Sequence, residues 1–162
     1  MFIRALLDAF LLYLPLSLMG RQPAAASYLT FIPSESYYAV SVGMMPLFLL
    51  GQWLLLGAVV HLVLRLLGRP GGFDQILNIT GMTGLIVGTF LVAWDWLWIA
   101  LGWGNDIALG LSHLVIDIWA IAIMVAAYRS LLGIPVRLGI VLNVLYLAIY
   151  VPLAMIFVRA PV

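Results

Sequence analysis

The chain consists of long apolar runs separated by short turn-forming sequences. The runs cover residues 2–19, 37–67, 73–102, 107–132 and 136–158. A helix needs roughly 20 apolar residues to cross the hydrocarbon core of a bilayer. Backbone polar groups in lipid must be paired within their own segment, which favours helices over open sheets. We therefore predict an all-α fold, a single transmembrane domain over residues 1–162 with five spans.

Composition excludes the alternatives to a membrane protein. Of the 162 residues, 66% are hydrophobic and 8% are charged, whereas soluble domains are about 25% charged. A net charge of +1 argues against a nucleic-acid partner. Cysteine and lysine are absent, which excludes thiolate and Schiff-base chemistry. We expect a multi-pass protein of a bacterial or archaeal cytoplasmic membrane, in contact with membrane lipids.

The first apolar run allows more than one interpretation. Arg4 and Asp8 are four residues apart and can pair on one face of a helix, while Pro15 would kink that helix. Arg4, the apolar stretch and the small residues 24–27 also resemble a signal peptide with its cleavage site. Asp8 inside the apolar stretch argues against cleavage. We favour a span, with an interfacial helix or a cleaved leader as the alternatives.

Arginine placement predicts the orientation of the bundle. On one side of a five-span bundle fall Arg4, Arg65, Arg69, Arg129 and Arg137. Arg21 and Arg159 fall on the other side. Because cytoplasmic loops are enriched in arginine, we predict a cytoplasmic N-terminus and an outer C-terminus. The collar formed by Arg65, Arg69, Arg129 and Arg137 is either this positive-inside signal alone or a site for anionic lipid headgroups.

Three ionisable residues lie inside the predicted third and fourth spans, namely Asp95, His113 and Asp117. His113 and Asp117 share a helix face, and the short loop between the spans makes them antiparallel neighbours. The three groups could therefore converge near the outer leaflet. One interpretation is a structural His113–Asp117 pair that locks the bundle, and the other is a proton-exchanging or divalent-cation site. Without a fourth ligand the metal evidence is weak, and we assign neither a metal nor a cofactor.

Two further patterns concern packing. The predicted third span ends in the tryptophans Trp94, Trp96, Trp98 and Trp103. Tryptophan favours the headgroup level, so these rings predict an aromatic belt, with a quinone or lipid site as the alternative. The stripe of Gly81, Gly84 and Gly88 predicts close helix packing, against the same chain, a second copy or another subunit. Asn143 is expected to form an interhelical hydrogen bond.

The turn after the second run resembles that of the Yip domain family, membrane proteins named for interacting with Ypt/Rab GTPases. The similarity lies in the run from His61 to Leu67, the turn Gly71-Gly72-Phe73 and the later Gly133-Ile134 turn, and it covers about residues 37–158. The resemblance implies five spans with a cytoplasmic N-terminus. The long cytoplasmic N-terminal region of eukaryotic members and the prolines of the family's third helix have no counterpart here. We therefore expect a short prokaryotic-type form, for which Rab binding is not implied.

Catalytic motifs are absent from the sequence. There is no Gly-x-Ser-x-Gly elbow, His-Glu-x-x-His or Gly-x-Gly-x-x-Gly, so we assign no catalytic residues. We expect a non-enzymatic scaffold or accessory subunit that contacts lipids and another membrane protein or a second copy. One alternative is a small transporter or proton- or ion-conducting component that uses Asp95, His113 and Asp117. The other is a small subunit of a respiratory or photosynthetic membrane complex.

Overall fold

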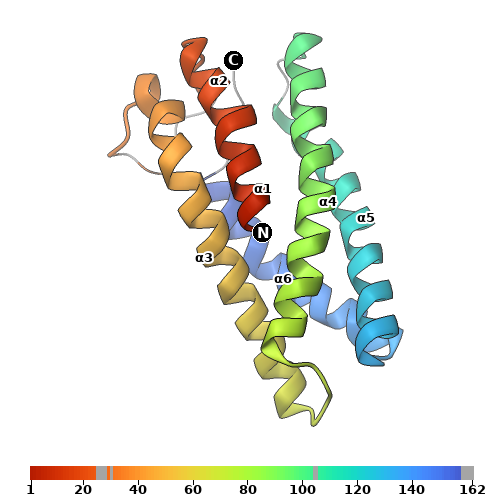
Figure 1. Cartoon of the computed structure of the whole chain (residues 1–162). Coiled ribbons are helices and arrows are strands. Elements are labelled where there is room, and N and C mark those ends of the chain that lie inside the picture. Colours follow the sequence, from red (N-terminus) through yellow and green to blue (C-terminus); the bar gives the residue numbers. More distant parts are fainter. Residues whose placement is uncertain (25–28, 30, 104–105, 158–162) are drawn as a thin grey trace.

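The computed structural model describes residues 1–24, 29, 31–103 and 106–157 (Figure 1). Four long helices run up and down the bundle: α3 (Tyr37–Leu66), α4 (Phe73–Ala100), α5 (Asp106–Leu132) and α6 (Val136–Phe157). The short 3-10 turn η2 (Ser34–Ser36) leads into α3. Each long helix contains a stretch that is long and apolar enough to cross a membrane. The all-α prediction is confirmed over the described residues, and the four helices are compatible with a multi-pass membrane protein.

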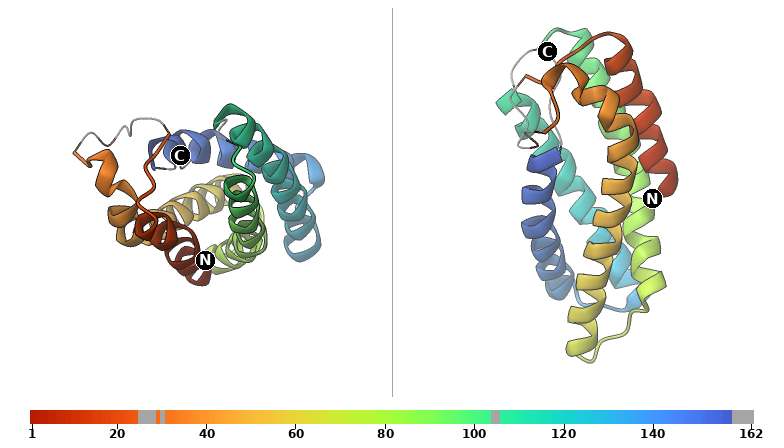
Figure 2. Two further views of the ribbon diagram at one scale, coloured as in Figure 1. Left: turned by 90° about the horizontal axis from the view of Figure 1, so that it is seen from above. Right: turned by 90° about the vertical axis from the view of Figure 1, so that its left-hand side faces the viewer.

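The first apolar run folds as one rod of three segments. These are α1 (Phe2–Leu7), the π-helical η1 (Asp8–Tyr13) and α2 (Leu14–Leu18). The rod lies beside the upper halves of α3 and α4, and its N-terminal end is level with the middle of the bundle (Figures 1 and 2). It is not among the four helices of spanning length. The predicted fifth crossing is therefore not confirmed, because the rod lies beside only about half of the length of α3 and α4.

The π-helical segment ends at Tyr13, and Pro15 follows in the first turn of α2. Proline has no N–H, so the carbonyl of Leu11 lacks the donor that would normally come from residue 15. The indole Nε1–H of Trp96 donates to this carbonyl at 2.6 Å. The Leu11 carbonyl, which Pro15 cannot pair with, thus accepts the hydrogen bond that joins the N-terminal rod to α4.

Both lower turns depend on a glycine in the left-handed region. Gly68 has φ +62° after α3, and Gly133 has φ +65° after α5. At these values a Cβ would be strained, while glycine ends the helix freely. The two turns place α4 antiparallel to α3, and α6 antiparallel to α5.

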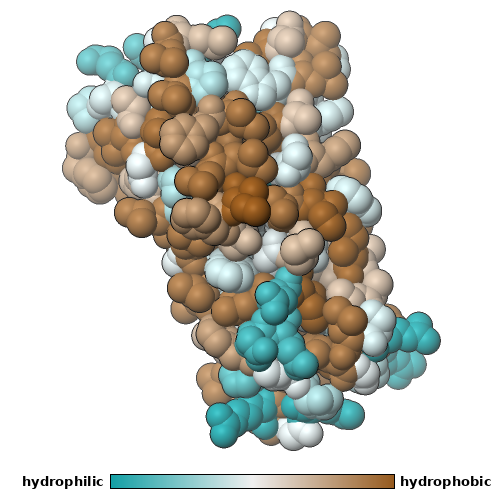
Figure 3. All heavy atoms as spheres, viewed as in Figure 1, coloured by the Kyte–Doolittle hydropathy of each residue, from teal (hydrophilic) through white to brown (hydrophobic). Residues whose placement is uncertain are grey.

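Two apolar clusters fill the bundle, one in each half. The upper cluster consists of Tyr13, Leu16, Ile32, Tyr37, Tyr38 and Met45. The lower cluster joins α3, α4, α5 and α6 and consists of Val60, Leu64, Ile76, Ile79, Met124, Tyr128, Leu132, Ile134 and Leu142. In the face shown in Figure 3, apolar surface covers most of the bundle, and hydrophilic groups gather toward its two ends.

The arginines are not all placed as predicted. Arg65, Arg69, Arg129 and Arg137 lie at or beside the two lower turns. Arg4 does not join them, because its guanidinium lies against Gly88 near the middle of α4 and pairs with Asp8 there. Arg159 lies outside the described residues. The collar therefore consists of four arginines, and the orientation of the bundle stays a prediction.

Candidate functional site

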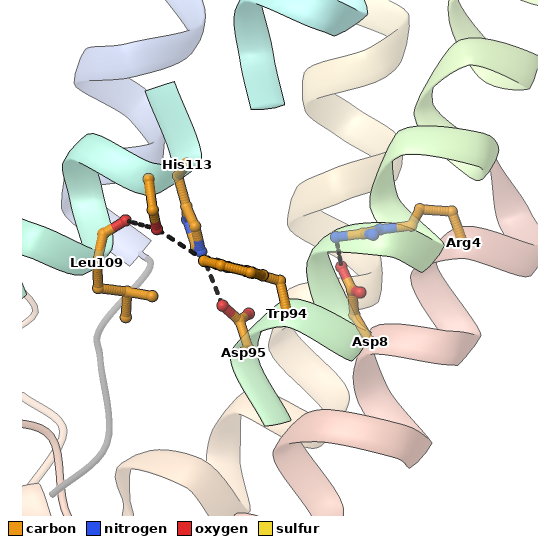
Figure 4. A network of polar contacts seen from close by, with 7 residues as sticks. Arg4, Asp8, Trp94, Asp95, Leu109 and His113 are labelled. Carbon is orange, nitrogen blue, oxygen red and sulfur yellow. Dashed lines mark hydrogen bonds and ion pairs between the residues drawn. The ribbon is translucent and has the colours of Figure 1, made fainter. Parts of the chain in front are cut away.

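The polar groups inside the bundle form two sets on opposite sides of α4 (Figure 4). The first set joins α4 to α5 in the upper half. His113 Nε2 lies 2.7 Å from Asp95 Oδ1, and the two side chains are 27% and 17% exposed. Beside them, Trp94 Nε1 donates to Ser112 Oγ at 2.8 Å. These contacts hold α4 and α5 together and leave the Asp95–His113 pair partly accessible.

Asp117 does not belong to this first set. No ion pair joins it to His113 among the described residues. Asp117 instead lines a partly open central cavity of about 90 Å³ between α1, α3, α4, α5 and α6. The three ionisable residues predicted to converge are therefore divided, with Asp95 and His113 paired and Asp117 one helical turn further into the bundle.

The lining of the central cavity is mostly apolar but includes polar side chains from several helices. Its polar side chains are those of Arg4, Gln52, Trp53, Thr80, Thr83, Asp117, Tyr146 and Tyr150. A water molecule needs roughly 10–15 Å³ of such volume and two to four polar partners. The cavity therefore has room for several water molecules.

Arg4 and Asp8 form an ion pair beside this cavity. Arg4 Nη2 lies 2.8 Å from Asp8 Oδ2, and the side chains are 13% and 6% exposed. Arg4 Nη1 and Asp8 Oδ1 have no hydrogen-bond partner in the structure. The predicted i, i+4 spacing thus produces a pair, and the cavity wall carries a buried cation whose charge is balanced locally.

The N-terminal rod packs against the glycine stripe of α4. A Cβ at Gly88 would overlap the guanidinium of Arg4, and a Cβ at Gly84 would lie 3.3 Å from the sulfur of Met1. At Gly81 the nearest atom belongs to Trp53, at 3.2 Å. The stripe is therefore occupied within the chain and is not an open surface for another subunit.

Several cavity residues were not among the candidates chosen from the sequence, namely Gln52, Trp53, Thr80, Thr83, Tyr146 and Tyr150. Trp53 Nε1 donates to Thr80 Oγ1 at 3.0 Å, and Gln52 Nε2 donates to the Tyr150 carbonyl at 3.5 Å. Tyr146 and Tyr150 stack with ring centroids 6.0 Å apart. Their spacing of four residues was the available signal, because it puts both rings on one face of α6.

The tryptophans of α4 form more than a belt. The indole N–H groups of Trp94 and Trp96 donate to Ser112 and Leu11 within the protein. Trp98 and Trp103 pack edge to face at 4.9 Å, and Trp103 is 49% exposed. Two of the four predicted belt residues thus use their donors to join helices.

The Gly-rich turn that resembles the Yip domain family is held by two side chains. His61 Nδ1 lies 3.0 Å from the Gly71 carbonyl, and the Gly72 N–H donates to Gln75 Oε1 at 3.0 Å. The ring of Phe73 packs beside His61 with centroids 5.9 Å apart. These contacts stabilise the turn and cap the N-terminus of α4.

Two other expectations have structural answers. Asn143 Nδ2 donates to the Gly139 carbonyl of its own helix, while its buried Oδ1 has no partner. The expected interhelical bond is not made, because the amide turns back along α6. In the part of the chain that the structure describes, no three His, Asp or Glu side chains come together as metal ligands.

Comparison of the chain with known protein families, with curated proteins and with solved structures finds no match. The Yip resemblance therefore stays a prediction. Function has to be inferred from the cavity and the polar pair, whose geometry allows proton exchange. Asp117 can gain and lose a proton, and hydroxyl groups and water can relay one.

Proposed function

We propose that the protein is a non-enzymatic membrane component that carries protons through the interior of its bundle. The observation that carries this proposal is that Asp117 lines a central cavity that has several polar side chains in its wall and room for water. An ionisable side chain inside a spanning helix is costly, and such groups commonly mark ion or proton pathways. The proposal favours the transport alternative over the scaffold, since the glycine stripe is already occupied by the chain itself.

The outer part of the proposed pathway runs along α5. Asp117 lies one turn below His113, about 6 Å along the helix, and His113 contacts Asp95. This pair is partly exposed, so water can connect it with the outer surface. Protons would enter at the Asp95–His113 pair and reach Asp117 through water in the cavity.

The inner part of the pathway is closed in this conformation. Below the cavity, the lower cluster packs apolar side chains of α3, α4, α5 and α6, among them Leu64, Ile76 and Met124. Such a region excludes water, so protons cannot pass without a rearrangement. The lower end carries the four collar arginines, and we place it at the cytoplasmic face. The arrangement supports gated conduction rather than an open pore.

Proton flux into liposomes that contain the purified protein tests this proposal. A potassium gradient with valinomycin imposes the voltage, and a trapped pH-sensitive dye reports the flux. We expect flux in the wild type and at least a tenfold loss in Asp117→Asn, which removes the exchangeable proton while keeping the shape. Glu35→Gln is the matched control, since Glu35 is exposed and lies outside the cavity. Equal flux in Asp117→Asn and wild type, or no flux in either, would refute the proposal.

A scaffold or accessory-subunit role is the second candidate, and one groove favours it. A groove of about 440 Å³ lies between the lower halves of α4 and α5. Gln75 and Asn78 line it and are exposed. Amides facing the membrane gain by pairing with another helix. Co-purification in mild detergent of a membrane protein that Asn78→Leu releases would support this role, while purification of the chain alone would contradict it.

A further inference from the structure

A second groove lies on the flank between α5 and α6, outside the central cavity. It has a volume of about 660 Å³. Ile118, Val125 and Ile140 form its walls, and the small side chains of Ala122 and Ala126 leave it shallow and open. Both alanines are exposed. The groove is thus an apolar furrow that faces the hydrocarbon of the membrane.

The lower end of this groove is cationic. Arg129 lines it there, and its side chain is exposed. The ion pairs of the described residues are Arg4–Asp8 and Asp95–His113, so Arg129 has no carboxylate partner among them. No acidic residue lines the groove. The Arg129 guanidinium therefore lies at the end of a mostly apolar groove, next to the Ser130 hydroxyl, which donates to the Ala127 carbonyl.

The length of the groove matches one leaflet. From Ile118 to Arg129, α5 rises about 16 Å at roughly 1.5 Å per residue. Half of a hydrocarbon core of roughly 30 Å is about 15 Å. A partner helix would need a contact surface along the whole membrane thickness, whereas a lipid needs one leaflet with a charge at the headgroup level.

We propose that the α5–α6 groove binds an anionic phospholipid. The phosphate of the headgroup accepts hydrogen bonds from the Arg129 guanidinium, whose planar fork suits phosphate oxygens. One acyl chain lies along Val125 and Ile118 over the two alanines. This site is separate from the proposed proton path, because Asp117 does not line the groove and, among the described residues, Ile121 alone lines both the groove and the central cavity.

Native mass spectrometry of the detergent-purified protein, titrated with phosphatidylglycerol or with phosphatidylcholine, tests the site. We expect the wild type to retain phosphatidylglycerol in preference to phosphatidylcholine. Arg129→Gln should lower phosphatidylglycerol binding roughly tenfold, as expected for the loss of a charge-assisted hydrogen bond. Ala126→Phe should also lower it, because the ring fills the furrow without changing any charge.

Arg137 provides the matched control. It is an exposed arginine at the same end of the bundle that does not line the groove, so Arg137→Gln should keep the preference. If Arg137→Gln lowers binding as much as Arg129→Gln does, the arginines attract the lipid together and the α5–α6 groove is not a specific site. If Ala126→Phe leaves binding unchanged, the acyl chain does not lie in the groove and the proposal is also refuted. Displacement of the lipid by millimolar inorganic phosphate would also overturn it, since the acyl chain would then contribute nothing.

Discussion

The guanidinium of Arg4 lies against Gly88, in the space that a Cβ at residue 88 would need. The absent side chain on α4 therefore allows a charged group from the first helix to enter the bundle. Asp8 balances that charge at 2.8 Å. The position of the N-terminal rod depends on this fit, because the rod and α4 approach most closely along the glycine stripe.

Gly88→Ala should displace Arg4 and lower the stability of the protein. Forcing a methyl group into a filled space costs about 1–3 kcal/mol. The change is measured by thermal unfolding of the detergent-purified protein. Gly110→Ala is the control, since a Cβ there meets nothing within 4 Å and alanine favours a helix. If both variants unfold at the wild-type temperature, Arg4 does not occupy this position.

Trp96→Phe should lower stability by about 1 kcal/mol, the usual net value of a hydrogen bond. The variant removes the donor to the Leu11 carbonyl. In a Pro15→Ala background the N–H of residue 15 can reach this carbonyl instead, so the same substitution should cost less. A double-mutant cycle measures the difference. Additive effects of the two substitutions would show that the proline and the indole are not coupled through Leu11.

Asp95→Leu should cost about 1–3 kcal/mol, because it leaves the His113 ring nitrogen without its acceptor in a mostly buried place. Asp95→Asn keeps an oxygen at this position and should be much milder. Equilibrium unfolding of the two variants compares them. A loss of equal size in both would mean that His113 requires the carboxylate charge rather than an acceptor.

The sequence allowed a good part of this arrangement to be predicted. The four long helices follow from apolar runs bounded by glycine and proline, and the Arg4–Asp8 pair follows from i, i+4 spacing. The division of His113 from Asp117 did not follow. Four residues advance about 40° beyond a full turn of an α-helix, and the packing of α4 against α5 decides which group meets Asp95. Contacts of that kind depend on how each helix is rotated about its own axis. A span that is hydrophobic on all faces has no polar side that would indicate this rotation from the sequence.

The half-length first helix was also beyond sequence reasoning. Its apolar run reads like a short span, whereas its depth is set by contacts with distant residues, namely Arg4 against Gly88 and the Trp96 bond to the Leu11 carbonyl. Trp53 and Gln52 escaped notice for a related reason. Both look like ordinary span residues until α4 and α6 bring Thr80 and Tyr150 next to them.

The depth of the first helix gives a final prediction, and the absence of cysteine makes it simple to test. Single-cysteine variants at Phe2, Ser34 and Asp74 are treated with a membrane-impermeant maleimide in sealed vesicles of known orientation. Ser34→Cys and Asp74→Cys are exposed positions at opposite ends of α3 and its following turn, so they should react from opposite sides. Phe2→Cys should react from neither side and only after denaturation, because Met1 lies beside Gly84, about 16 Å above the start of α4 and near the middle of a core roughly 30 Å thick. Labelling of Phe2→Cys from the side that labels Asp74→Cys would establish a fifth crossing instead. The N-terminal rod would then lie lower along α4, with Phe2 at the level of Asp74.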